Sequence, residues 1–191
     1  MEEPIELECI LKCESHGKIA FLQEFELPRC GNVETYFLFG AKHKPVIVFP
    51  LTTGGKVIAV EHFRFGANDW VLEVPGGNVE GKKTIEKTAR EELEQETGYT
   101  SDNIIPVGPP TWFDPASFRV TFSPMLALGC TEKKDGLKLE KTEILRRPAP
   151  IPLREWVEMI SRQEIHDSKT IAITMMVLCH LYADCIIECV K

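Results

Sequence analysis

The sequence lacks positively charged runs, and its overall charge is acidic. It has 22 Lys and Arg residues against 29 Asp and Glu residues, which gives a formal net charge of −7 at pH 7. Proteins that bind nucleic acid through bulk charge need an excess of basic groups. We therefore expect no nucleic-acid partner. An anionic substrate would need a metal ion and a few local basic groups to hold it.

A long uncharged apolar run is also absent. A membrane-spanning helix needs about 20 consecutive, predominantly apolar residues. The best candidate, Ile171 to Val190, is interrupted by His180, Asp184 and Glu188. The sequence therefore predicts no membrane partner.

The cysteines form neither a zinc motif nor a disulfide framework. Their number is odd, they are scattered, and no second pair completes a zinc pattern with the first two. No secretory leader precedes them, so we expect reduced thiols in a cytoplasmic protein. The seven are Cys9, Cys13, Cys30, Cys130, Cys179, Cys185 and Cys189.

The length of 191 residues fits one domain, or one domain with a small extension. Hydrophobic residues make up 43% of the chain, which is enough for a core. The chain shows no internal repeat and no low-complexity segment.

One stretch, Gly76 to Tyr99, organises the rest of the chain. Two glycines follow a strand-like run, and a helix-like run then ends at Gly98. Thr84 is a residue type favoured at the N-cap of a helix, and glycine is favoured just past the end of one. The sequence therefore predicts a helix from near Thr84 to Gly98. The acidic residues of the stretch are Glu80, Glu86, Glu91, Glu92, Glu94 and Glu96.

The helical period sorts these residues by face. At about 100° per residue, Ile85, Ala89 and Leu93 form the stripe that we expect to be buried. Glu92 and Glu96 are one turn apart and fall on the same side. Glu94 lies well outside the stripe, and we expect it to be solvated.

Two carboxylates that point inward one turn apart repel each other, and burial disfavours their charge. A bound divalent cation makes such a pair tolerable, and oxygen ligands suit Mg²⁺ or Mn²⁺. Glu92 and Glu96 are thus candidate metal ligands. The alternative is a helix edge that carries ordinary surface glutamates.

The spacing resembles the signature of the Nudix hydrolases. That signature reads Gly, five residues, Glu, seven residues, Arg-Glu, an aliphatic residue, one residue, Glu-Glu, one residue, Gly and an aliphatic residue. The positions that match here are Gly77, Glu92, Leu93, Glu96 and Gly98.

Three positions depart from the signature. Lys83 stands in place of Glu and Glu91 in place of Arg, so the supporting ion pair of the family could form here with its signs exchanged. The alternative is that Glu91 pairs with Lys87, one turn back. Gln95 stands in place of the first Glu of the Glu-Glu pair, which keeps the shape and removes one negative charge.

The resemblance implies the Nudix fold, an α/β fold with a mixed sheet sandwiched between α-helices. It implies metal-dependent hydrolysis of a nucleoside diphosphate linked to another moiety, such as ADP-ribose or a nucleotide sugar. It also implies that the metal, Mg²⁺ or Mn²⁺, is held by Glu92, Glu96 and the backbone carbonyl of Gly76.

Further positions resemble the ADP-ribose pyrophosphatases within the family. The resemblance implies that Arg64 reaches the diphosphate, that Glu73 lies near the substrate, and that Pro115 marks the subfamily. The alternative for Arg64 is a surface residue near a strand end. His62, beside it, we interpret as a surface or core histidine.

Aromatic residues near Pro115 offer rings for a base or ribose. Trp112, Phe113 and Phe118 are the candidates, and Phe118 is the one that we assign to substrate binding. They could equally be core aromatics, and we expect at least one of them to be.

A further catalytic Glu is supplied by a loop in the family. Glu140 and Glu143 are the candidates here, and we prefer Glu140, because the family pattern has an acidic residue just ahead of the strand that begins near Ile144. A solvated charge in a loop is the alternative for both.

We expect residues 1–44 to form a small β extension and residues 45–191 the Nudix hydrolase domain. The resemblance implies that the extension exchanges with a partner subunit in a homodimer. The alternative is extra strands folded on their own domain. The predicted strands of the extension are Ile5–Leu11, Ile19–Leu27 and Thr35–Phe39.

In the main domain we predict strands at Val46–Leu51, Val57–Arg64 and Trp70–Pro75. A further strand over residues 119–128 is predicted to break at Pro124. Helices are predicted over Leu153–Arg162 and from about Ser168 onward, the second with Asp167 or Ser168 as its cap. Met175 and Met176 are predicted to lie in the core.

The rival to a hydrolase is a protein on the same scaffold that has lost catalysis and binds a nucleotide or a protein partner. Gln95 is the main reason for this alternative.

Overall fold

The computed structural model describes residues 3–28, 30–133 and 144–190, and the side chains up to residue 183. The chain forms two compact units. The first unit consists of Met1–Lys44 and Thr111–Phe122, and the second of Pro45–Pro110 and Ser123–Lys191.

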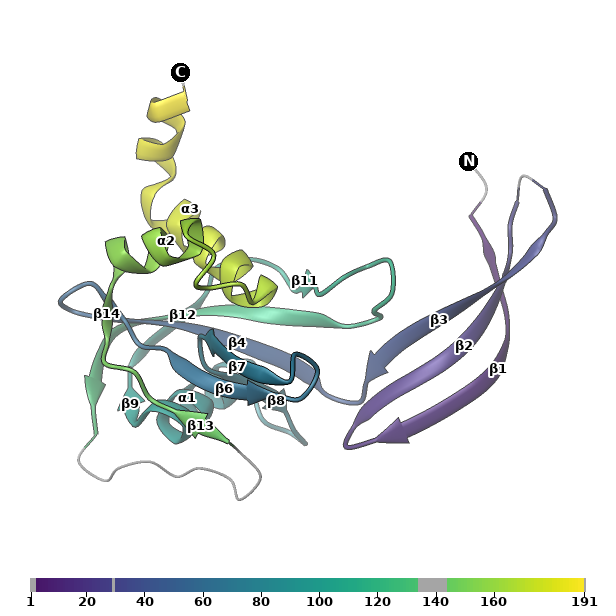
Figure 1. The fold of residues 1–191 in the computed structure, drawn as a ribbon, viewed down its shortest axis with the longest axis horizontal. Helices are drawn as coiled ribbons and strands as arrows, with labels where there is room; N and C mark the ends of the chain where they lie inside the picture. The colour runs from purple at the N-terminus through teal and green to yellow at the C-terminus, as the bar shows by residue number, and fades with distance from the viewer. Residues whose placement is uncertain (1–2, 29, 134–143, 191) are drawn as a thin grey trace. The chain divides into compact units, whose positions relative to one another are not determined.

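The first unit is built on an antiparallel sheet of three consecutive strands, β1 (Ile5–Ser15), β2 (Lys18–Glu26) and β3 (Val33–Ala41) (Figure 1). A tight turn joins β1 to β2 at His16 and Gly17, both of which have positive φ. The three strands predicted from the sequence are confirmed; β1 and β3 have wider bounds, and β2 is shifted by one residue.

A second piece of the chain completes this unit. Strand β11 (Thr111–Trp112) pairs with Thr121 and Phe122, the first residues of β12. The loop between them bridges to β3: the Phe39 amide donates to the Ser117 carbonyl at 2.8 Å, and the Arg119 amide donates to the Phe39 carbonyl at 2.8 Å.

The second unit contains a mixed sheet in the order β10-β12-β4-β5-β14, in which β12 and β4 run parallel and the other pairs antiparallel. Strand β8 pairs with β4, β9 pairs with β12, and a smaller antiparallel sheet has the order β13-β6-β7. The strands of this unit are β4 (Lys44–Thr52), β5 (Lys56–Val57), β6 (Val60–Arg64), β7 (Asp69–Glu73), β8 (Gly76–Val79), β9 (Tyr99–Thr100), β10 (Asn103–Pro106), β12 (Thr121–Glu132), β13 (Leu145–Arg146) and β14 (Ile151–Pro152).

The central strand β4 is covered on both faces, as its continuous apolar run predicts. Val46 and Val48 belong to a buried cluster with Leu93 of helix α1 (Ile85–Thr97). Phe49 faces the other way and packs edge-on against Trp156 of helix α2 (Leu153–Ser161), with 6.3 Å between the ring centroids. In Figure 1, α1 lies on one side of the sheet, and α2 and α3 (Ser168–Val190) lie on the other.

The helix caps follow the sequence signals. Thr84 accepts a hydrogen bond from the Lys87 amide at 3.2 Å, and Gly98 ends α1 with φ 74°. At the start of α3, Asp167 accepts from the Thr170 amide at 2.9 Å, which confirms it as the cap. Helix α3 is interrupted at Tyr182, whose φ and ψ are −133° and 23°.

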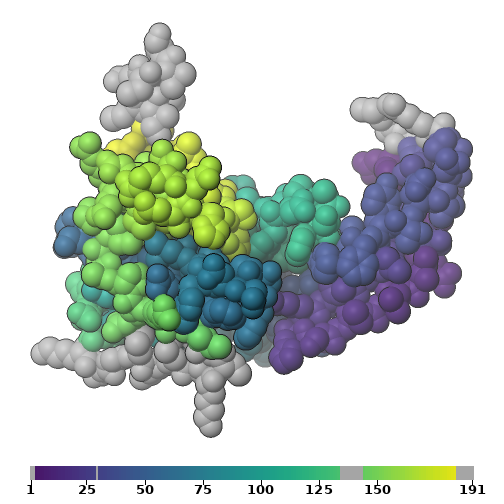
Figure 2. Space-filling model, viewed as in Figure 1, coloured from purple at the N-terminus to yellow at the C-terminus, as the bar shows by residue number. Residues whose placement is uncertain are grey.

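The start of α3 also meets the second sheet. The side-chain oxygen of Thr170 accepts a hydrogen bond from the Val74 amide, just beyond β7, at 3.2 Å. On the face drawn in Figure 2, the residues of α2 and α3 (green to yellow) form a continuous surface with the β6–β7 hairpin (blue). The chain just beyond Glu73 is thereby held by α3 as well as by strand pairing.

Four local predictions were wrong. Strand β12 continues through Pro124, which still accepts a hydrogen bond from the Val107 amide at 3.2 Å. Met175 is 57% exposed, because α3 turns that face away from the sheet, and Ile85, in the first turn of α1, is exposed as well. The run Val57–Arg64 is two strands, β5 and β6, with a break at residues 58–59.

Among the described residues, no helix is both long enough and apolar enough to span a membrane.

Candidate active site

Glu96 lies at the centre of the contact between α1 and β8. It is only 2% exposed, and its Oε2 accepts a hydrogen bond from the Gly76 amide at 3.0 Å. The predicted inward position of Glu96 is therefore confirmed. A buried carboxylate in a helix is uncommon unless it is paired or binds a metal.

Glu92, one turn earlier on α1, is half-buried, and its carboxylate lies against Gly77. A β-carbon at position 77 would collide with that carboxylate, and one at Gly76 would lie 2.5 Å from the Val46 carbonyl oxygen. Glycine permits both close approaches, that of β8 to β4 at Gly76 and that of β8 to the Glu92 carboxylate at Gly77. Gly76 is thus required by the packing of two strands, and Gly77 by the position of one carboxylate.

The donor set fits a hard divalent cation. Two carboxylates from one helix face and the backbone of the adjacent glycine strand supply the oxygen ligands that Mg²⁺ or Mn²⁺ prefers. Within the described ranges, no group of three or more His, Cys, Asp and Glu side chains is placed to hold a metal. The loop candidates Glu140 and Glu143 lie outside the described residues.

The ion pair with exchanged signs is present. Lys83 Nζ lies 2.8 Å from Glu91 Oε2, and this hydrogen bond raises the pKa of Lys83. Lys87 Nζ lies farther from the same carboxylate, at 3.9 Å. Glu91 thus ties the loop that precedes α1 to the outer face of the helix, and the weaker contact to Lys87 accompanies that pair.

The prediction that Glu94 is solvated was wrong. It is half-buried, and it accepts hydrogen bonds from Lys133 Nζ at 2.8 Å and from Thr100 Oγ1 at 2.6 Å. Burial opposes its charge, but these hydrogen bonds outweigh burial and lower the pKa of Glu94. Its partners come from β9 and the end of β12, which a helical wheel does not reveal.

The carboxyl end of α1 is held by two basic residues that the sequence reasoning missed. The Lys133 amide donates to the Gly98 carbonyl at 2.8 Å, and the Arg147 guanidinium donates to the Thr97 carbonyl. Lys133 contributes a backbone amide, whereas Arg147 contributes a charged group, which is favourable at this end of a helix because its last carbonyls lack intrahelical partners. Both residues are far from α1 in the sequence, Arg147 by 50 residues from Thr97, so no local signal pointed to them.

Arg64 and Glu73 form an ion pair on the β6–β7 hairpin. Glu73 is 2% exposed, whereas the Arg64 side chain is 43% exposed. His62, two residues before Arg64 on the same face, places its Nδ1 3.4 Å from Glu73 Oε1. The structure therefore brings these three side chains together, and His62 belongs to this cluster.

Burial is the largest influence on both titratable groups of the cluster. It raises the pKa of Glu73, which the Arg64 guanidinium only partly offsets. Burial and the same guanidinium lower the pKa of His62 to about 4. His62 is therefore neutral near pH 7, and Arg64 supplies the positive charge of the cluster.

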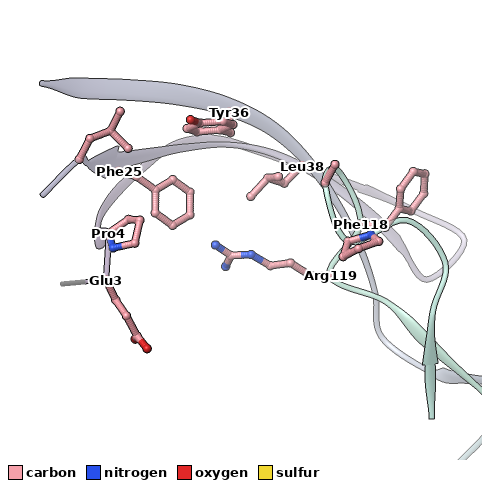
Figure 3. A pocket seen from close by; sticks show the side chains of 10 residues that line it. Glu3, Pro4, Phe25, Tyr36, Leu38, Phe118 and Arg119 are labelled. Carbon is pink, nitrogen blue, oxygen red and sulfur yellow. The ribbon is translucent and has the colours of Figure 1, made fainter. Parts of the chain in front are cut away.

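Pro115 and Phe118 belong to the first unit, where they border a hollow of about 430 Å³. Figure 3 shows the Arg119 guanidinium pointing into this hollow toward Phe25, with 5.7 Å between the guanidinium carbon and the ring centroid. Phe118 stacks on Phe39, with ring centroids 5.0 Å apart.

The two other aromatics of this segment differ in exposure. Trp112 is exposed, whereas Phe113 is half-buried and packs edge-on against Phe122, with 5.5 Å between the ring centroids. The expectation that at least one aromatic of the segment packs internally is thus confirmed by Phe113.

Two curated relatives are similar to most of the chain. One is the "ADP-ribose pyrophosphatase" of Bacillus subtilis (strain 168), which is 27% identical over 157 residues, 81% of this chain and 82% of that protein. The other is the "Methanol dehydrogenase activator" of Bacillus methanolicus, 27% identical over 163 residues, 81% of this chain and 83% of that protein.

Solved structures share the fold. The structure described as "Crystal structure of ADP compounds hydrolase" aligns with a TM-score of 0.80 at 15% sequence identity, and covers 96% of this chain and 97% of that one. A "NUDIX hydrolase from Nitrosomonas europaea" aligns with a TM-score of 0.53 at 18% identity, and covers 71% and 87%. The predicted fold class, a mixed sheet with helices on both sides and a small β extension, is confirmed.

The family model described as "NUDIX domain" matches residues 41–167, a range that contains α1, β8 and the β6–β7 hairpin. Together with the carboxylates at the Gly76-Gly77 strand, this match establishes that the chain belongs to the Nudix hydrolase family.

Proposed function

We propose that the protein hydrolyses a nucleoside diphosphate linked to another moiety, most simply ADP-ribose, to AMP and ribose 5-phosphate. A nucleotide sugar is the second substrate of the same class. The name of the Bacillus subtilis relative supports ADP-ribose. The observation that carries the proposal is the approach of Glu92 and Glu96 to the Gly76-Gly77 strand.

Hydrolysis of a diphosphate is slow because its negative oxygens repel a nucleophile. Glu92, Glu96 and the Gly76 carbonyl are the residues that would hold Mg²⁺ or Mn²⁺. The cation would neutralise that charge and make a water molecule more acidic. Thr84 and Gly98 cap the two ends of α1 and thereby help to keep its carboxylates in place.

Arg64 is proposed to bind the diphosphate, because its guanidinium is the exposed member of a cluster that is otherwise buried. A planar guanidinium matches two phosphate oxygens at once. Glu73 lies beside it and is proposed to adjoin the substrate. Glu140 is proposed to orient or deprotonate the water.

Pro115 and Phe118 are proposed to contact the base or ribose. The hollow that they border in the first unit supports this, since it presents an apolar wall and one guanidinium. Aromatic rings and guanidinium planes both stack on bases.

We further propose a homodimer in which the extension, residues 1–44, is exchanged. The first unit exposes many large apolar side chains, which is unusual for a surface that faces only water. They are Ile5, Leu7, Ile10, Leu11, Val33, Tyr36 and Phe37. Light scattering after size-exclusion chromatography tests it: a mass near 21.6 kDa, that of one chain, would contradict the dimer.

A cytoplasmic location is proposed as well. The cysteines whose side chains the structure describes are free thiols, which suits a reducing compartment. They are Cys9, Cys13, Cys30, Cys130 and Cys179. Titration of the thiols in protein freshly purified under air-free conditions tests this. A disulfide content that persists there would contradict it.

The test of the function is a panel of ADP-ribose, nucleotide sugars and dinucleotides, assayed with Mg²⁺, with Mn²⁺ and with a chelator. The expected result is cleavage of ADP-ribose that requires the metal, with AMP and ribose 5-phosphate as products. Cleavage of none of them, with nucleotide still bound, would favour the rival function.

The rival is a scaffold that binds a nucleotide or a protein partner without turnover. Gln95 motivates it, and so does the name of the Bacillus methanolicus relative, an activator of another enzyme. Gln95→Glu restores the charge of the family pattern and distinguishes an active hydrolase from a scaffold that binds without turnover. A large gain in turnover means that the native site is impaired, whereas unchanged turnover means that Gln95 only supports it.

A further inference from the structure

In the Arg64–Glu73 pair the carboxylate is buried and the guanidinium is partly exposed, a difference that the proposed hydrolysis does not use. Val60 lies opposite Glu73 in the hairpin register, and side chains alternate along a strand, so Val60, His62, Arg64 and Glu73 share one face. Arg64 is four residues from Val60, so its long side chain reaches back along β6 to meet the carboxylate.

One oxygen of Glu73 serves both neighbours. Oε1 faces the Arg64 guanidinium as an ion pair and His62 Nδ1 at 3.4 Å. Both Oε1 and Nδ1 are buried; within the described part of the chain Nδ1 makes no hydrogen bond, whereas Oε1 has the Arg64 guanidinium as its hydrogen-bonding, charged partner. The charge of Glu73 therefore depends on Arg64.

The other charged groups around Glu73 come from the segment that leads into α3. Lys169 and Asp167 both act on its charge, in opposite senses, and they are paired with each other. Their net effect on Glu73 is therefore small. Arg64 is the dominant counter-charge.

A diphosphate that binds Arg64 competes with Glu73 for the same guanidinium. Two anions cannot share it at close range without repelling each other. The exposed guanidinium can rotate toward the ligand, but the buried carboxylate cannot follow it into water. Glu73 then remains buried without its counter-ion, and protonation is the least costly way to remove that charge.

We propose that Arg64 and Glu73 form an exchangeable pair: a diphosphate that takes the Arg64 guanidinium leaves the Glu73 carboxylate to bind one proton from solvent. This rests on the proposed contact between Arg64 and the diphosphate. The step is balanced, since the carboxylate and the proton give the carboxylic acid, which can share its proton with His62 Nδ1. Glu73 is thus a positioning residue that holds Arg64 in the empty site, and substrate binding is coupled to proton uptake.

Calorimetry tests the coupling directly on the whole protein. A non-hydrolysable methylene analogue of ADP-ribose is titrated at saturating Mg²⁺ in buffers that differ in ionisation enthalpy. The dependence of the observed heat on that enthalpy gives the number of protons bound. An internal diphosphate diester is a strong acid and does not titrate near neutral pH, so the protein must supply the site.

The expected result is uptake of up to one proton, with affinity that strengthens by up to about tenfold for each unit that the pH is lowered. Glu73→Gln should bind the analogue with no uptake and no such pH dependence. Asp69→Asn is the matched control, because Asp69 lies opposite Arg64 on the same hairpin but is exposed. It should behave as the unmodified protein does.

Two results would overturn the coupling: binding of the analogue without proton uptake, or equal uptake in Glu73→Gln. Either leaves the proposed hydrolysis intact, since the analogue still binds. Failure of the analogue to bind at all would overturn both. The measurement on the unmodified protein needs no variant, so it remains decisive even if Glu73→Gln does not fold.

Discussion

The Glu92 carboxylate occupies the space that a β-carbon on Gly77 would fill. The glycine and the glutamate are fifteen residues apart, on β8 and α1, and each fixes where the other can lie. A backbone without a side chain is what allows a carboxylate to approach this closely. Position 77 therefore sets how closely the Glu92 carboxylate can lie against β8.

Gly77→Ala should disable the site. The added methyl must displace the Glu92 carboxylate or move the strand, and overpacking of this kind costs about 1–3 kcal/mol. We expect turnover to fall at least about tenfold, with a modest fall in the unfolding temperature. Steady-state kinetics and calorimetric melting measure both.

Gly66→Ala is the control for this substitution. No atom lies within 4 Å of a β-carbon built at Gly66, and its φ is outside the left-handed region. It should leave turnover unchanged. If Gly77→Ala were as active as Gly66→Ala, the close approach would have no bearing on catalysis.

Glu96→Gln should abolish turnover and leave the fold intact. The amide oxygen can still accept the hydrogen bond from Gly76, but the negative charge available to a cation is lost. We expect a loss of more than about a hundredfold in kcat, with an unchanged circular dichroism spectrum. Glu86→Gln, on the exposed side of the same helix, is the control. Normal activity in Glu96→Gln would mean that this carboxylate is not part of the site.

Much of α1 could be predicted because its determinants are local. The cap at Thr84, the left-handed Gly98 and the inward Glu96 all follow from spacing within one helix. The exchanged pair of Lys83 and Glu91 could also be predicted, because the two residues are eight apart in the sequence and flank the first two turns.

What could not be predicted depends on partners from distant parts of the chain. Glu94 is paired because Lys133 arrives from 39 residues away. The role of His62 became visible only through the register of β6 and β7, which sets it beside Glu73. Pro124 stays within β12 although its nitrogen cannot donate: it keeps its place opposite Ile47 of β4, and its carbonyl accepts from the Val107 amide, contacts that a local rule about proline does not foresee.

The Lys83–Glu91 pair should tolerate a second exchange of its signs. Lys83→Glu places two carboxylates together and should lower the unfolding temperature. Adding Glu91→Lys restores opposite charges in the orientation that the family signature has, and should recover most of the loss. Thermal melting of the two single variants and the double variant measures this coupling. A double variant no more stable than Lys83→Glu would show that the contact contributes nothing.

Acid should destabilise the folded protein partly through His62. Burial and the neighbouring Arg64 lower its pKa to about 4 from the ordinary 6.5. The folded chain thus binds this proton more weakly than the unfolded chain does. The stabilisation is complete above about pH 6.5 and is lost progressively as the pH falls toward 4.

In part of this range the raised pKa of Glu73 stabilises the folded protein as the pH falls, which opposes the effect of His62. The contribution of His62 is therefore obtained as the difference between the unmodified protein and a variant that lacks this histidine. The free energy of unfolding, measured with urea from pH 7 to about pH 4, should fall less steeply in His62→Gln than in the unmodified protein. His166→Gln, which changes an exposed histidine, should retain the original slope. Equal slopes for His62→Gln and the unmodified protein would mean that His62 binds its proton equally well in the folded and unfolded states, which would contradict its burial beside Arg64.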